Sequence, residues 1–492
     1  MTTAAKSAGI PVHFVDTTLR DGSQSLWAGS MRTDMLLPVV ERIDQAGFQS
    51  MEIIGASFFK KMVRDLKDDP WERLRSVNAL VRNTRLRAIL GRHTSGFSFT
   101  PEAVSQLYLE RLFVYGVREM RISDSSNTPF YWKKRVSDAK RVGLGAVLNL
   151  IYSISPLHTD DYYRKLTREA IKLPIDRLCL KDPGGLLTPE RTRVLAKIVA
   201  HEARHVPVEF HTHCNTGLGP LAVLEAIKAG ITIINTAIPP LANGSSNPSI
   251  FNVAENAAAL GYAPQIDLDV LRPVAAHFND VARRAGFPVG VPLEYTESHY
   301  THQVPGGMIS NLRHQLTQMK LLDKLPAVLE EIVRVRQDLG YPIMVTPYSQ
   351  FVGVQATLNV IAGERYKQLT DEIVQYAMGL WGDVERDAIE PNLRDRILAS
   401  PRARELAGWT PPEPTVDEMR QVLGGPSLSD DELLLRYFAG AHAVEAMRNA
   451  PPRSEYTVDG RRPLVELVRE LANKPGMSQV RIEKKGLLLH MS

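Results

Sequence analysis

The stretch Val206-Pro-Val-Glu-Phe210 leads directly into His211-Thr-His213, and a second apolar run, Ile231-Thr-Ile-Ile234, follows after the amphipathic residues 220–229. Short β-rich runs separated by a helical period are typical of a strand–helix–strand unit with parallel strands. Gly230 stands where a helix C-cap is expected, because glycine adopts left-handed backbone angles without a steric cost. This stretch therefore predicts one β–α–β unit.

The same pattern occurs eight times within residues 12–262. The apolar runs are Val12-His-Phe-Val15, Met51-Glu-Ile-Ile54, Leu86-Arg-Ala-Ile-Leu90, Glu119-Met-Arg-Ile122, Ala146-Val-Leu-Asn-Leu-Ile151, Arg177-Leu-Cys-Leu180, Val206-Pro-Val-Glu-Phe210 and Ile231-Thr-Ile-Ile234. Eight such units predict an α/β fold of the (β/α)8 TIM-barrel type. A doubly wound open sheet is the competing fold, and the count of eight favours the barrel.

The alternation stops near residue 262, and a second pattern begins. Helical periods cover residues 266–285, 310–339, 364–380 and 430–448. We therefore expect a barrel domain over residues 1–262, a mostly helical domain over 263–450 and a small α/β tail over 451–492. In the tail, residues 462–474 are typical of a helix, and residues 478–482 and 486–490 are typical of strands.

Composition excludes several classes of protein. Hydrophobic residues make up 44% and charged residues 23% of the 492 residues, which is ordinary for a globular chain. The net charge of +4 and the lack of a long run of like charges argue against nucleic-acid binding. No apolar stretch reaches the roughly 18 residues that a membrane span needs. The two cysteines, Cys179 and Cys214, form no disulfide framework, and we expect a cytoplasmic protein.

Polar residues follow the apolar runs at the points where the strands are expected to end. In a barrel these carboxyl ends form the active-site face. Because side chains alternate along a strand, His211 and His213 point to the same face and can act as two ligands of a divalent metal. Taken alone, the pair fits a polar strand end equally well. The other strand ends contribute residues 16–24, Arg92-His93, residues 123–127, Lys181-Asp182 and a segment near Asn243.

A metal held by two histidines usually has a carboxylate ligand as well, and Asp21 can supply it from the segment after the first strand. Lys181 has two interpretations. An ammonium group has no lone pair, so the simpler one, favoured by the residues alone, is an ion pair with Asp182 or Asp21. In the alternative, Lys181 reacts with carbon dioxide, and the resulting carbamate is an oxygen ligand.

Several motifs, taken in order, carry a family resemblance. They are Asp16-Thr-Thr-Leu-Arg-Asp-Gly-Ser-Gln-Ser25, Asp69-Pro-Trp-Glu-Arg-Leu-Arg75, Lys181-Asp182, His211-Thr-His213, His302-Gln-Val-Pro-Gly-Gly-Met-Ile-Ser-Asn311 and Val345-Thr-Pro-Tyr-Ser-Gln350. The chain thereby resembles the carboxyltransferase domains of the pyruvate carboxylase group, which includes subunits of transcarboxylase and oxaloacetate decarboxylase. The first motif would also fit related lyase and aldol-type synthase barrels, and the last two motifs separate the families.

The resemblance implies a metal centre and a substrate class. It implies that Asp21, His211, His213 and a carbamylated Lys181 hold a divalent metal, with zinc as the first expectation and cobalt or manganese as alternatives. It also implies a 2-oxo acid substrate such as pyruvate or oxaloacetate. The substrate's oxygens would be bound and polarised by the residues Arg92, Arg20 and Gln24. A metal and a guanidinium aimed at an enolate oxygen stabilise its developing charge.

The resemblance further implies a carboxyl exchange with biotin. Thr346 would carry the proton between the substrate carbon and the biotin nitrogen, and Ser349 would lie near the biotin ring. From the residues alone, a threonine before proline is an ordinary turn residue. No biotin attachment motif is found in the chain, so we expect biotin on a separate carrier protein, a separate biotin carboxylase subunit, and a homodimer by analogy.

The expected biotin pocket departs from the family pattern more than the metal centre does. Lys60 stands where the family has an acidic residue, Phe97 or Phe99 replaces a tyrosine, and Pro183 follows Lys181-Asp182 in place of methionine. A reversed charge and a lost hydroxyl would change hydrogen bonding there. A biotin-independent carbon–carbon lyase or synthase, acting on an oxo acid or acyl-CoA, is therefore the alternative function, and an inactive scaffold is a third.

Overall fold

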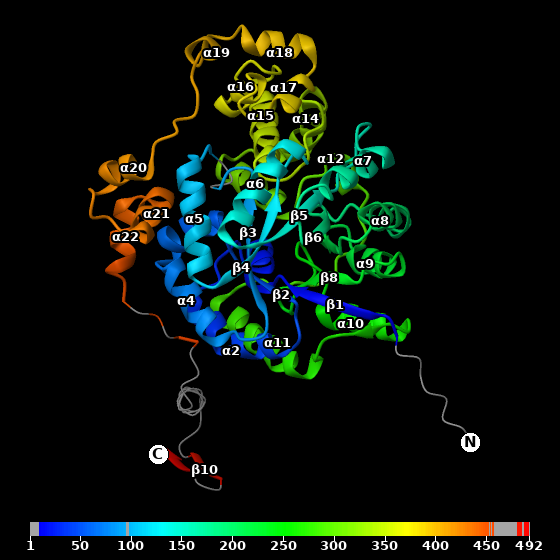
Figure 1. The fold of residues 1–492 in the computed structure, drawn as a ribbon, viewed down its shortest axis with the longest axis vertical. Coiled ribbons are helices and arrows are strands. Elements are labelled where there is room, and N and C mark those ends of the chain that lie inside the picture. Colours follow the sequence, from blue (N-terminus) through cyan, green and yellow to red (C-terminus); the bar gives the residue numbers. More distant parts are fainter. Residues whose placement is uncertain are drawn as a thin grey trace.

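The eight predicted runs form the eight strands of a closed parallel barrel (Figure 1). The computed structural model describes residues 9–94, 98–451, 453, 455, 456, 480–484 and 487–491. Each strand pairs in parallel with the next, and β1 pairs with both β8 and β2, which closes the ring. The barrel prediction is confirmed and the open sheet is wrong. The strands are β1 (Pro11–Asp16), β2 (Ser50–Gly55), β3 (Arg85–Gly91), β4 (Val117–Ser123), β5 (Gly145–Ile151), β6 (Arg177–Asp182), β7 (Val208–Thr212) and β8 (Ile233–Thr236).

Helices connect the strands and surround the barrel. Thr188 illustrates how they begin, since its hydroxyl accepts a hydrogen bond from the Arg191 amide at 3.1 Å and Pro189 occupies the first turn. A two-residue strand, β9 (Ala263–Pro264), pairs with β1. The barrel helices are α1 (Ser23–Leu26), α2 (Thr33–Gln45), α3 (Ala56–Lys61), α4 (Pro70–Leu80), α5 (Glu102–Val114), α6 (Pro129–Val142), α7 (Asp160–Ala170), α8 (Pro189–Ala203), α9 (Gly219–Lys228) and α10 (Ile250–Ala259), with the π-helical turns η1 (Thr18–Gly22) and η2 (Met62–Leu66).

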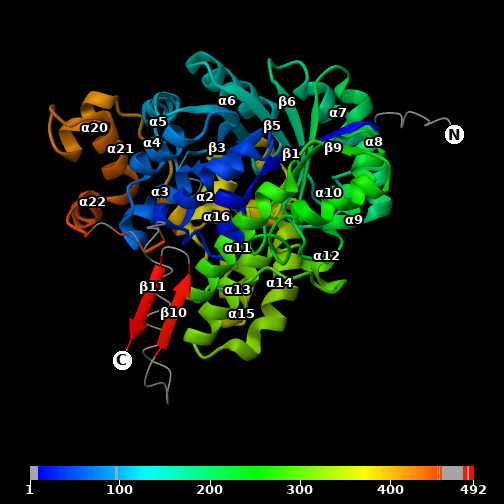
Figure 2. The ribbon, with the colours of Figure 1, turned by 90° about the horizontal axis from the view of Figure 1, so that it is seen from below.

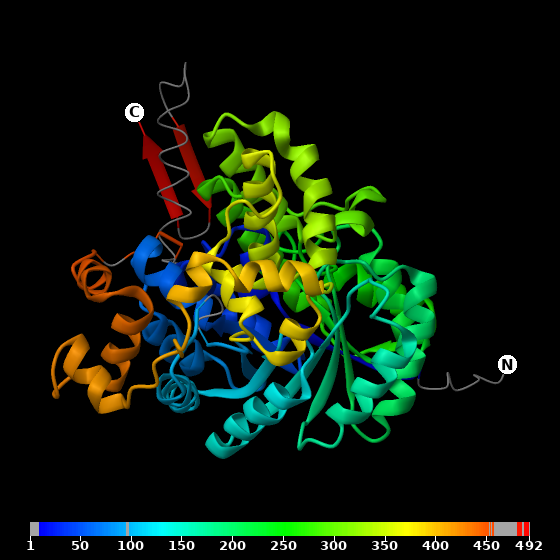
Figure 3. The ribbon, with the colours of Figure 1, turned by 90° about the horizontal axis from the view of Figure 1, so that it is seen from above.

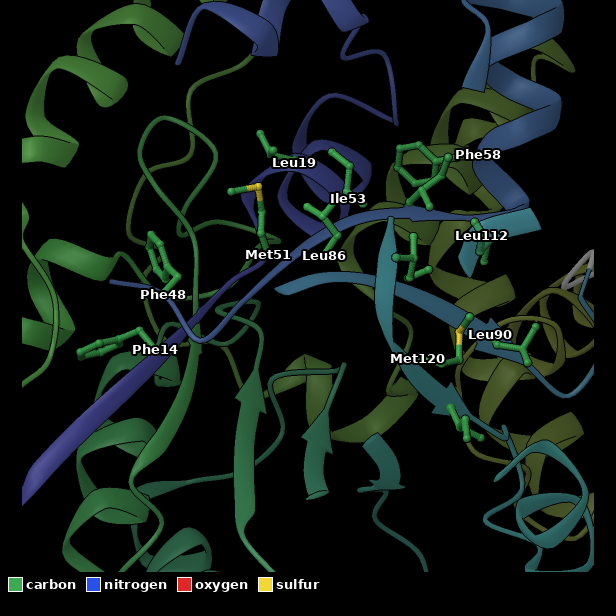
Figure 4. Packing of buried hydrophobic residues seen from close by; sticks show 14 of the residues in the cluster. Phe14, Leu19, Phe48, Met51, Ile53, Phe58, Leu86, Leu90, Leu112 and Met120 are labelled. Atoms are coloured by element: carbon green, nitrogen blue, oxygen red, sulfur yellow. The ribbon is translucent and has the colours of Figure 1, made fainter. Parts of the chain in front are cut away.

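The main apolar core lies between the strands and these helices. Figure 4 shows part of it, with Ile53, Leu86 and Met120 on neighbouring strands and Leu112 on α5. These side chains are almost completely buried. Burial of a side chain of this size contributes about 1.5–3 kcal/mol, so the outward-facing residues of the strands fix the helices around the barrel.

The inside of the barrel holds a buried network of charges below the active-site face. Arg87 donates to Glu209 through two nitrogens, at 2.7 and 3.0 Å, and to Glu119 at 2.6 Å. Arg177 pairs with the same two carboxylates, each at 2.7 Å. Buried charges are tolerated when they are paired and hydrogen-bonded. Polar side chains therefore fill the barrel without leaving an isolated charge.

Replacing Arg87 with alanine is expected to lower the free energy of unfolding by about 3–5 kcal/mol, because it leaves buried carboxylates without their main partner. Urea denaturation followed by circular dichroism measures the change. Arg272→Ala is the control, since this exposed arginine pairs with Asp269 at the surface and its loss is expected to change the free energy by about 0.5 kcal/mol or less. Equal stability of Arg87→Ala and the wild type would contradict the prediction.

A group of helices follows the barrel. Seen from above, in Figure 3, the yellow helices of this group lie over the barrel, on the side where they contact the strand ends. The helices are α11 (Leu268–Ala285), α12 (Ser298–His302), α13 (Gly306–Gln318), η3 (Leu322–Lys324, a 3-10 turn), α14 (Leu325–Asp338), α15 (Tyr348–Ala362), α16 (Asp371–Ala377), α17 (Asp383–Asp387), α18 (Pro391–Leu398), α19 (Pro401–Glu405), α20 (Val416–Leu423), α21 (Asp430–Ala439) and α22 (Ala441–Arg448).

Three of the predicted helices are wrong in extent. The single helix expected over residues 310–339 is divided, because Lys320 adopts a φ of +59° and Pro326 starts a new helix. The helix expected over 430–448 ends at Gly440, whose φ is +88°, and restarts after it. The helix expected over 364–380 shrinks to α16, while α15 was not predicted.

The post-barrel residues form two packing groups. Apolar residues between Val304 and Ala403 form their own buried cluster. In contrast, α21 packs on the barrel cluster, where the ring of Phe438 lies 5.7 Å from the rings of Phe59 and Tyr108. Figure 1 shows α20 to α22 beside α5. The domain limits at residues 262 and 450 stay a prediction.

The tail contains a two-stranded antiparallel sheet. β10 (Val480–Lys484) pairs with β11 (Leu487–Met491), and Figure 2 shows the two strands side by side. They lie one or two residues from the strands expected at 478–482 and 486–490. The helix expected over residues 462–474 falls outside the described residues. No helix in the described part of the chain is long and apolar enough to span a bilayer.

Candidate metal centre and active site

Three of the predicted metal ligands meet at the carboxyl ends of the strands. The turn η1 after β1 carries Asp21, and β7 carries His211 and ends just before His213. Asp21 Oδ2 lies 3.3 Å from His211 Nε2 and 3.7 Å from His213 Nε2. All three residues are buried, and their ligand atoms lie within 4.8 Å of one another. The structure therefore brings together a carboxylate and two imidazoles from opposite ends of the barrel sequence.

The other ring nitrogen of each histidine is already engaged. His211 Nδ1 lies 3.1 Å from Asn235 Oδ1, and His213 Nδ1 lies 2.6 Å from the carbonyl oxygen of Ser245. Both partners are acceptors, so each Nδ1 carries the proton and each Nε2 presents a lone pair toward Asp21. Asn247, which was not predicted from the sequence, lies behind this pair and donates to the Thr212 carbonyl at 2.8 Å.

Asp21 shows that this group of residues fits a cation. Its Oδ2 atom is buried and accepts no hydrogen bond within the described part of the chain. Burial by itself would raise the pKa of Asp21, but the charge of the neighbouring Arg20 stabilises the ionised carboxylate, and that pKa lies well below its ordinary value. An ionised carboxylate beside two imidazole lone pairs is a suitable ligand set for zinc and similar divalent metals.

Lys181 lies next to this group, on β6, in register with His211 on β7. It is buried, and among the described residues its ammonium makes no ion pair with Asp21 or Asp182. Asp182 instead accepts hydrogen bonds from the amides of Leu186 and Leu187, at 2.9 and 2.8 Å. The choice between the two interpretations of Lys181 stays a prediction. Burial, assisted by the charge of Arg121, lowers the pKa of Lys181 to about 8.

Arg20 and Gln24 lie beside the ligand group as predicted. Arg20 Nη2 is 3.1 Å from Asp21 Oδ2, and Arg20 Nη1 donates to Gln24 Oε1 at 3.0 Å. Arg20 also pairs with Glu52, whose second oxygen accepts from Arg121 Nη1 at 2.7 Å. Glu52 and Arg121 were not predicted, because each stands in the middle of an apolar run. Together they place two guanidinium groups close to the ligand group.

Arg92, at the end of β3, lies in a second group of residues. Its guanidinium makes four hydrogen bonds and one further ion pair. The partners are Asp124 Oδ1 at 2.6 Å, Glu385 Oε1 at 2.7 Å, Tyr348 Oη at 3.1 Å, Thr128 Oγ1 at 3.2 Å and the carbonyl oxygen of Trp381. These contacts hold the guanidinium at the end of β3. The substrate-binding role of Arg92 stays a prediction.

Thr346 lies in the same group as Arg92. Its carbonyl oxygen accepts a hydrogen bond from Ser125 Oγ at 2.7 Å, and its side chain is exposed. Thr346, Arg92, Ser125, Tyr348 and Trp381 line a cavity of about 20 Å³, which is room for one water molecule. Within the described residues no hydrogen bond or ion pair joins this group to the ligand group. Contact between the two groups, through a substrate, stays a prediction.

The remaining predicted positions are Ser349, Lys60, Phe97 and Phe99. Ser349, on α15, is buried, and its Oγ has no hydrogen-bond partner in the described part of the chain. Lys60 is exposed on α3. Phe99 packs against the rings of Trp381 and His93, with centroids at 4.8 and 5.0 Å, while Phe97 lies outside the described residues.

His93 gives this region a pH-dependent stability. Burial, together with the charges of Arg92 and Arg135, lowers the pKa of His93 to about 3. The unfolded chain binds a proton near pH 6.5 and the folded chain near pH 3, so stability present above pH 6.5 is lost as the pH falls toward 3. Between pH 7 and pH 4.5 this one group is expected to cost about 2 kcal/mol.

His93→Phe tests that prediction, because phenylalanine keeps the ring contacts but does not titrate. Urea titrations measure the unfolding free energy of each protein at pH 7 and at pH 4.5. The fall in this free energy between the two pH values is expected to be about 2 kcal/mol smaller in the variant than in the wild type. Equal losses of unfolding free energy in the two proteins would show that the protonation of His93 is not coupled to folding.

Fold and site together define a (β/α)8 barrel with a candidate metal centre at the carboxyl ends of its strands. Residues 153–277 match a family model described as HMGL-like, and residues 300–437 match one described as a conserved carboxylase domain. The chain is 38% identical to a pyruvate carboxylase subunit of Methanocaldococcus jannaschii, over 82% of this chain and 71% of that protein. It is 32% identical to the methylmalonyl-CoA carboxyltransferase 5S subunit of Propionibacterium freudenreichii subsp. shermanii, over 82% and 80%.

A solved structure confirms the fold. The carboxyl transferase domain of Rhizobium etli pyruvate carboxylase, solved with pyruvate, superposes with a TM-score of 0.81 at 23% identity, covering 90% of this chain and 78% of that chain. The chain therefore belongs to the family of carboxylase and carboxyltransferase subunits that includes the archaeal pyruvate carboxylase subunit and the methylmalonyl-CoA carboxyltransferase 5S subunit. The family resemblance predicted from the motifs is confirmed.

Proposed function

We propose that this chain is the carboxyltransferase subunit of a biotin-dependent enzyme, and that it moves a carboxyl group between biotin and a 2-oxo acid such as pyruvate or oxaloacetate. The observation that carries the proposal is the convergence of Asp21, His211 and His213 at the barrel mouth of a chain from this family. Biotin would arrive on a separate carrier protein charged by a separate biotin carboxylase. We expect a homodimer in the cytoplasm.

Asp21, His211, His213 and a carbamate on Lys181 would hold one divalent metal ion, with zinc as the first choice and cobalt or manganese as alternatives. When bound, the ion supplies Lewis-acid polarisation of the 2-oxo group. Carbamate formation needs the neutral amine, and the burial that lowers the pKa of Lys181 favours that form. In this reaction the Lys181 nitrogen forms a bond to the carbon of carbon dioxide and releases one proton.

Arg92, Arg20 and Gln24 are proposed to bind the oxo acid. Arg20 Nη2 is buried and makes ion pairs with Asp21 and Glu52, yet it makes no well-directed hydrogen bond within the described residues. A donor of this kind can point to a substrate oxygen and stabilise the negative charge that develops there. The Gln24 amide, held by Arg20 at 3.0 Å, offers its N–H donors to the substrate carboxylate.

Thr346 is proposed to carry the proton, since a hydroxyl can both donate and accept. In the carboxylation direction, Thr346 Oγ takes a proton from the methyl carbon of the oxo acid and gives its own to the biotin nitrogen that released carbon dioxide. The substrate carbon then forms its new bond to that carbon dioxide. Decarboxylation is the reverse. The unpartnered Ser349 hydroxyl is proposed to hydrogen-bond to the biotin ring.

A biotin-independent lyase or synthase is the second candidate. The match of residues 153–277 to the HMGL-like model is compatible with it, and so is Lys60 at a position where an acidic residue was expected. The match of residues 300–437 to the conserved carboxylase domain favours the carboxyltransferase, because this segment contains Thr346 and Ser349.

Biotin-stimulated decarboxylation distinguishes the two candidates. The purified, metal-loaded chain is incubated with oxaloacetate, with and without free biotin, and pyruvate is measured after subtraction of the spontaneous reaction. The carboxyltransferase requires the rate to rise with biotin concentration. A substantial rate that does not depend on biotin would support the lyase, and no catalysis with oxaloacetate or other β-carboxylated oxo acids would count against the proposal.

A further inference from the structure

We infer that Asn149 and Arg121 hold the carbamate of Lys181, by donating hydrogen bonds to the carbamate oxygen that does not face the metal. Both are positioning residues, because they make Lys181 the lysine that reacts with carbon dioxide. This inference rests on the proposed function, which takes Lys181 as the carbamylated ligand. Lys181 is the only buried lysine among the described residues, and Asn149 and Arg121 are completely buried.

The three residues lie on the neighbouring strands β4, β5 and β6. Asn149 on β5 is in register with Cys179 on β6, and Ile151 is in register with Lys181. Because side chains alternate along a strand, Asn149 and Ile151 face the same side of β5, as Cys179 and Lys181 do on β6. Asn149 therefore lies one layer below Lys181, further from the barrel mouth.

Asn149 has a hydrogen-bond donor without an acceptor. Its Oδ1 accepts from Arg121 Nε at 3.1 Å, which fixes the orientation of the amide group. Its Nδ2 is buried and makes no hydrogen bond within the described part of the chain. Buried polar groups in native proteins almost always have a partner, and a buried donor without one is costly. An acceptor that the surrounding side chains do not supply is therefore expected at Nδ2, and a carbamate oxygen is such an acceptor.

Arg121 has one guanidinium nitrogen that lacks a strong acceptor. Nε donates to Asn149, and Nη1 donates to Glu52 Oε2 at 2.7 Å. Among the described residues Nη2 contacts Cys179 Sγ alone, at 3.9 Å, and a thiol sulfur is a weak acceptor. This contact also places Nη2 in the layer of Cys179, just below Lys181. Asn149 Nδ2 and Arg121 Nη2 are thus two available donors below the Lys181 side chain.

The charges around Lys181 favour a carbamate over an ammonium group. The guanidinium groups of Arg121 and Arg20 and the carboxylates of Asp21 and Glu52 all act on it. Burial lowers the pKa of Lys181, and the charge of Arg121 is the next largest cause, so this guanidinium lies close to the Lys181 nitrogen. The positive charge that repels an ammonium attracts a carbamate. Arg121 therefore favours the product of the reaction with carbon dioxide.

Carbamate formation uses the neutral amine of Lys181. Its Nζ forms a bond to the carbon of carbon dioxide, one carbon–oxygen electron pair moves onto oxygen, and one proton leaves Nζ for water. The negative charge is shared by two oxygens. One oxygen would face Asp21, His211 and the metal, and the other would accept from Asn149 Nδ2 and Arg121 Nη2. Hydrogen bonds to an ionised group are stronger than those between neutral groups.

Asn149→Asp tests the inference, because it keeps an oxygen for Arg121 Nε and replaces the Nδ2 donor with a second oxygen. That oxygen repels a carbamate and attracts an ammonium. The full, zinc-loaded chain is titrated with carbon-13 bicarbonate, and the carbamate is measured by carbon-13 NMR. The variant is expected to need about 10- to 100-fold more bicarbonate than the wild type for half-maximal carbamate.

Two further variants separate the lost donor from other effects. Asn149→Leu removes the donor without adding a charge and is expected to need about tenfold more bicarbonate. Val147→Ala removes buried volume on the same face of β5 but no donor, so it is expected to keep the wild-type titration. The inference is overturned if both Asn149 variants titrate like the wild type, or if Val147→Ala weakens the carbamate as much as they do.

Zinc affinity, measured against a competing chelator, gives a second readout that does not depend on activity. Because a carbamate would add one ligand, the zinc affinity of the wild type is expected to rise with the bicarbonate concentration. In Lys181→Ala it is expected not to respond to bicarbonate, and in Asn149→Asp the rise is expected to need at least about tenfold more bicarbonate. A wild-type response in Asn149→Asp would overturn the inference.

These outcomes distinguish the inference from the proposed function. If the wild type forms the carbamate and the Asn149 variants weaken it, the inference stands even when the chain shows no biotin-dependent decarboxylation. If the wild type is active and Asn149→Asp carries the same amount of carbamate, the inference alone is overturned. A wild type without carbamate overturns the inference together with the ligand role of Lys181.

Discussion

His211→Ala is expected to lose the bound metal and to lower kcat for biotin-dependent decarboxylation by at least about 10³-fold. A metal held by these residues would polarise the 2-oxo group and supply several kcal/mol of charge stabilisation, and about 1.4 kcal/mol corresponds to a factor of ten in rate. His211 is fully buried, and its Nε2 lies 3.3 Å from Asp21, so no water-exposed group can replace it. The metal content of the purified protein, measured by elemental analysis, is expected to fall from about one ion per chain to well below that ratio.

Lys181→Ala is expected to show the same loss of metal, because it removes the nitrogen that would carry the carbamate. Cys214→Ala is the matched control: Cys214 directly follows the histidine pair and is buried, but it belongs to no candidate ligand group among the described residues. The control is expected to keep its metal and most of its activity. Full retention of metal in Lys181→Ala would refute the carbamate, and full retention in His211→Ala would refute the metal centre itself.

Thr346→Ala is expected to lower kcat by about 10²- to 10⁴-fold while metal content and KM for oxaloacetate stay near the wild-type values. The expected fall in kcat equals the rate enhancement that a positioned proton carrier usually contributes. The Thr346 side chain is exposed and its hydroxyl has no partner within the described residues, so the loss of Oγ is not expected to destabilise the fold. Stopped assays of pyruvate formation measure kcat, and elemental analysis measures the metal.

Thr346→Ser is the matched variant, because it keeps the hydroxyl and removes only the methyl group. We expect it to retain at least about a tenth of the wild-type kcat, since proton transfer depends on the oxygen. If Thr346→Ala keeps wild-type kcat, the proton is carried by another group and the role given to Thr346 is wrong.

The barrel was predictable from sequence because each strand is a short apolar run in a regular repeat. Neighbouring strands then pair in the order in which they occur in the chain. The helix limits were less predictable. Lys320 interrupts a helical period through its own backbone conformation, which no local pattern announces. The candidate metal ligands were predictable for the same reason as the strands: Asp21, His211 and His213 occupy local motifs at strand ends.

The contacts of Arg92 were not predictable, because they involve residues that are distant in the sequence. Arg92 is separated from Tyr348 by 256 positions and from Trp381 by 289 positions. Only the folded chain shows that these groups meet at Arg92. Arg121 and Glu52 were not predictable for a related reason, since a charged residue inside a barrel strand is indistinguishable in sequence from one on the outer face.

The most direct test of the central claim follows a labelled carboxyl group. The metal-loaded chain is mixed with oxaloacetate carrying carbon-13 in the carboxyl group that is transferred, together with a biotinylated carrier protein, and the carrier is analysed by mass spectrometry. The account predicts labelled carboxyl groups on the biotin with the wild type and a strongly reduced amount with Thr346→Ala and His211→Ala. Unlabelled biotin, with all of the carbon-13 released as carbon dioxide at a rate that does not depend on the carrier, would contradict it.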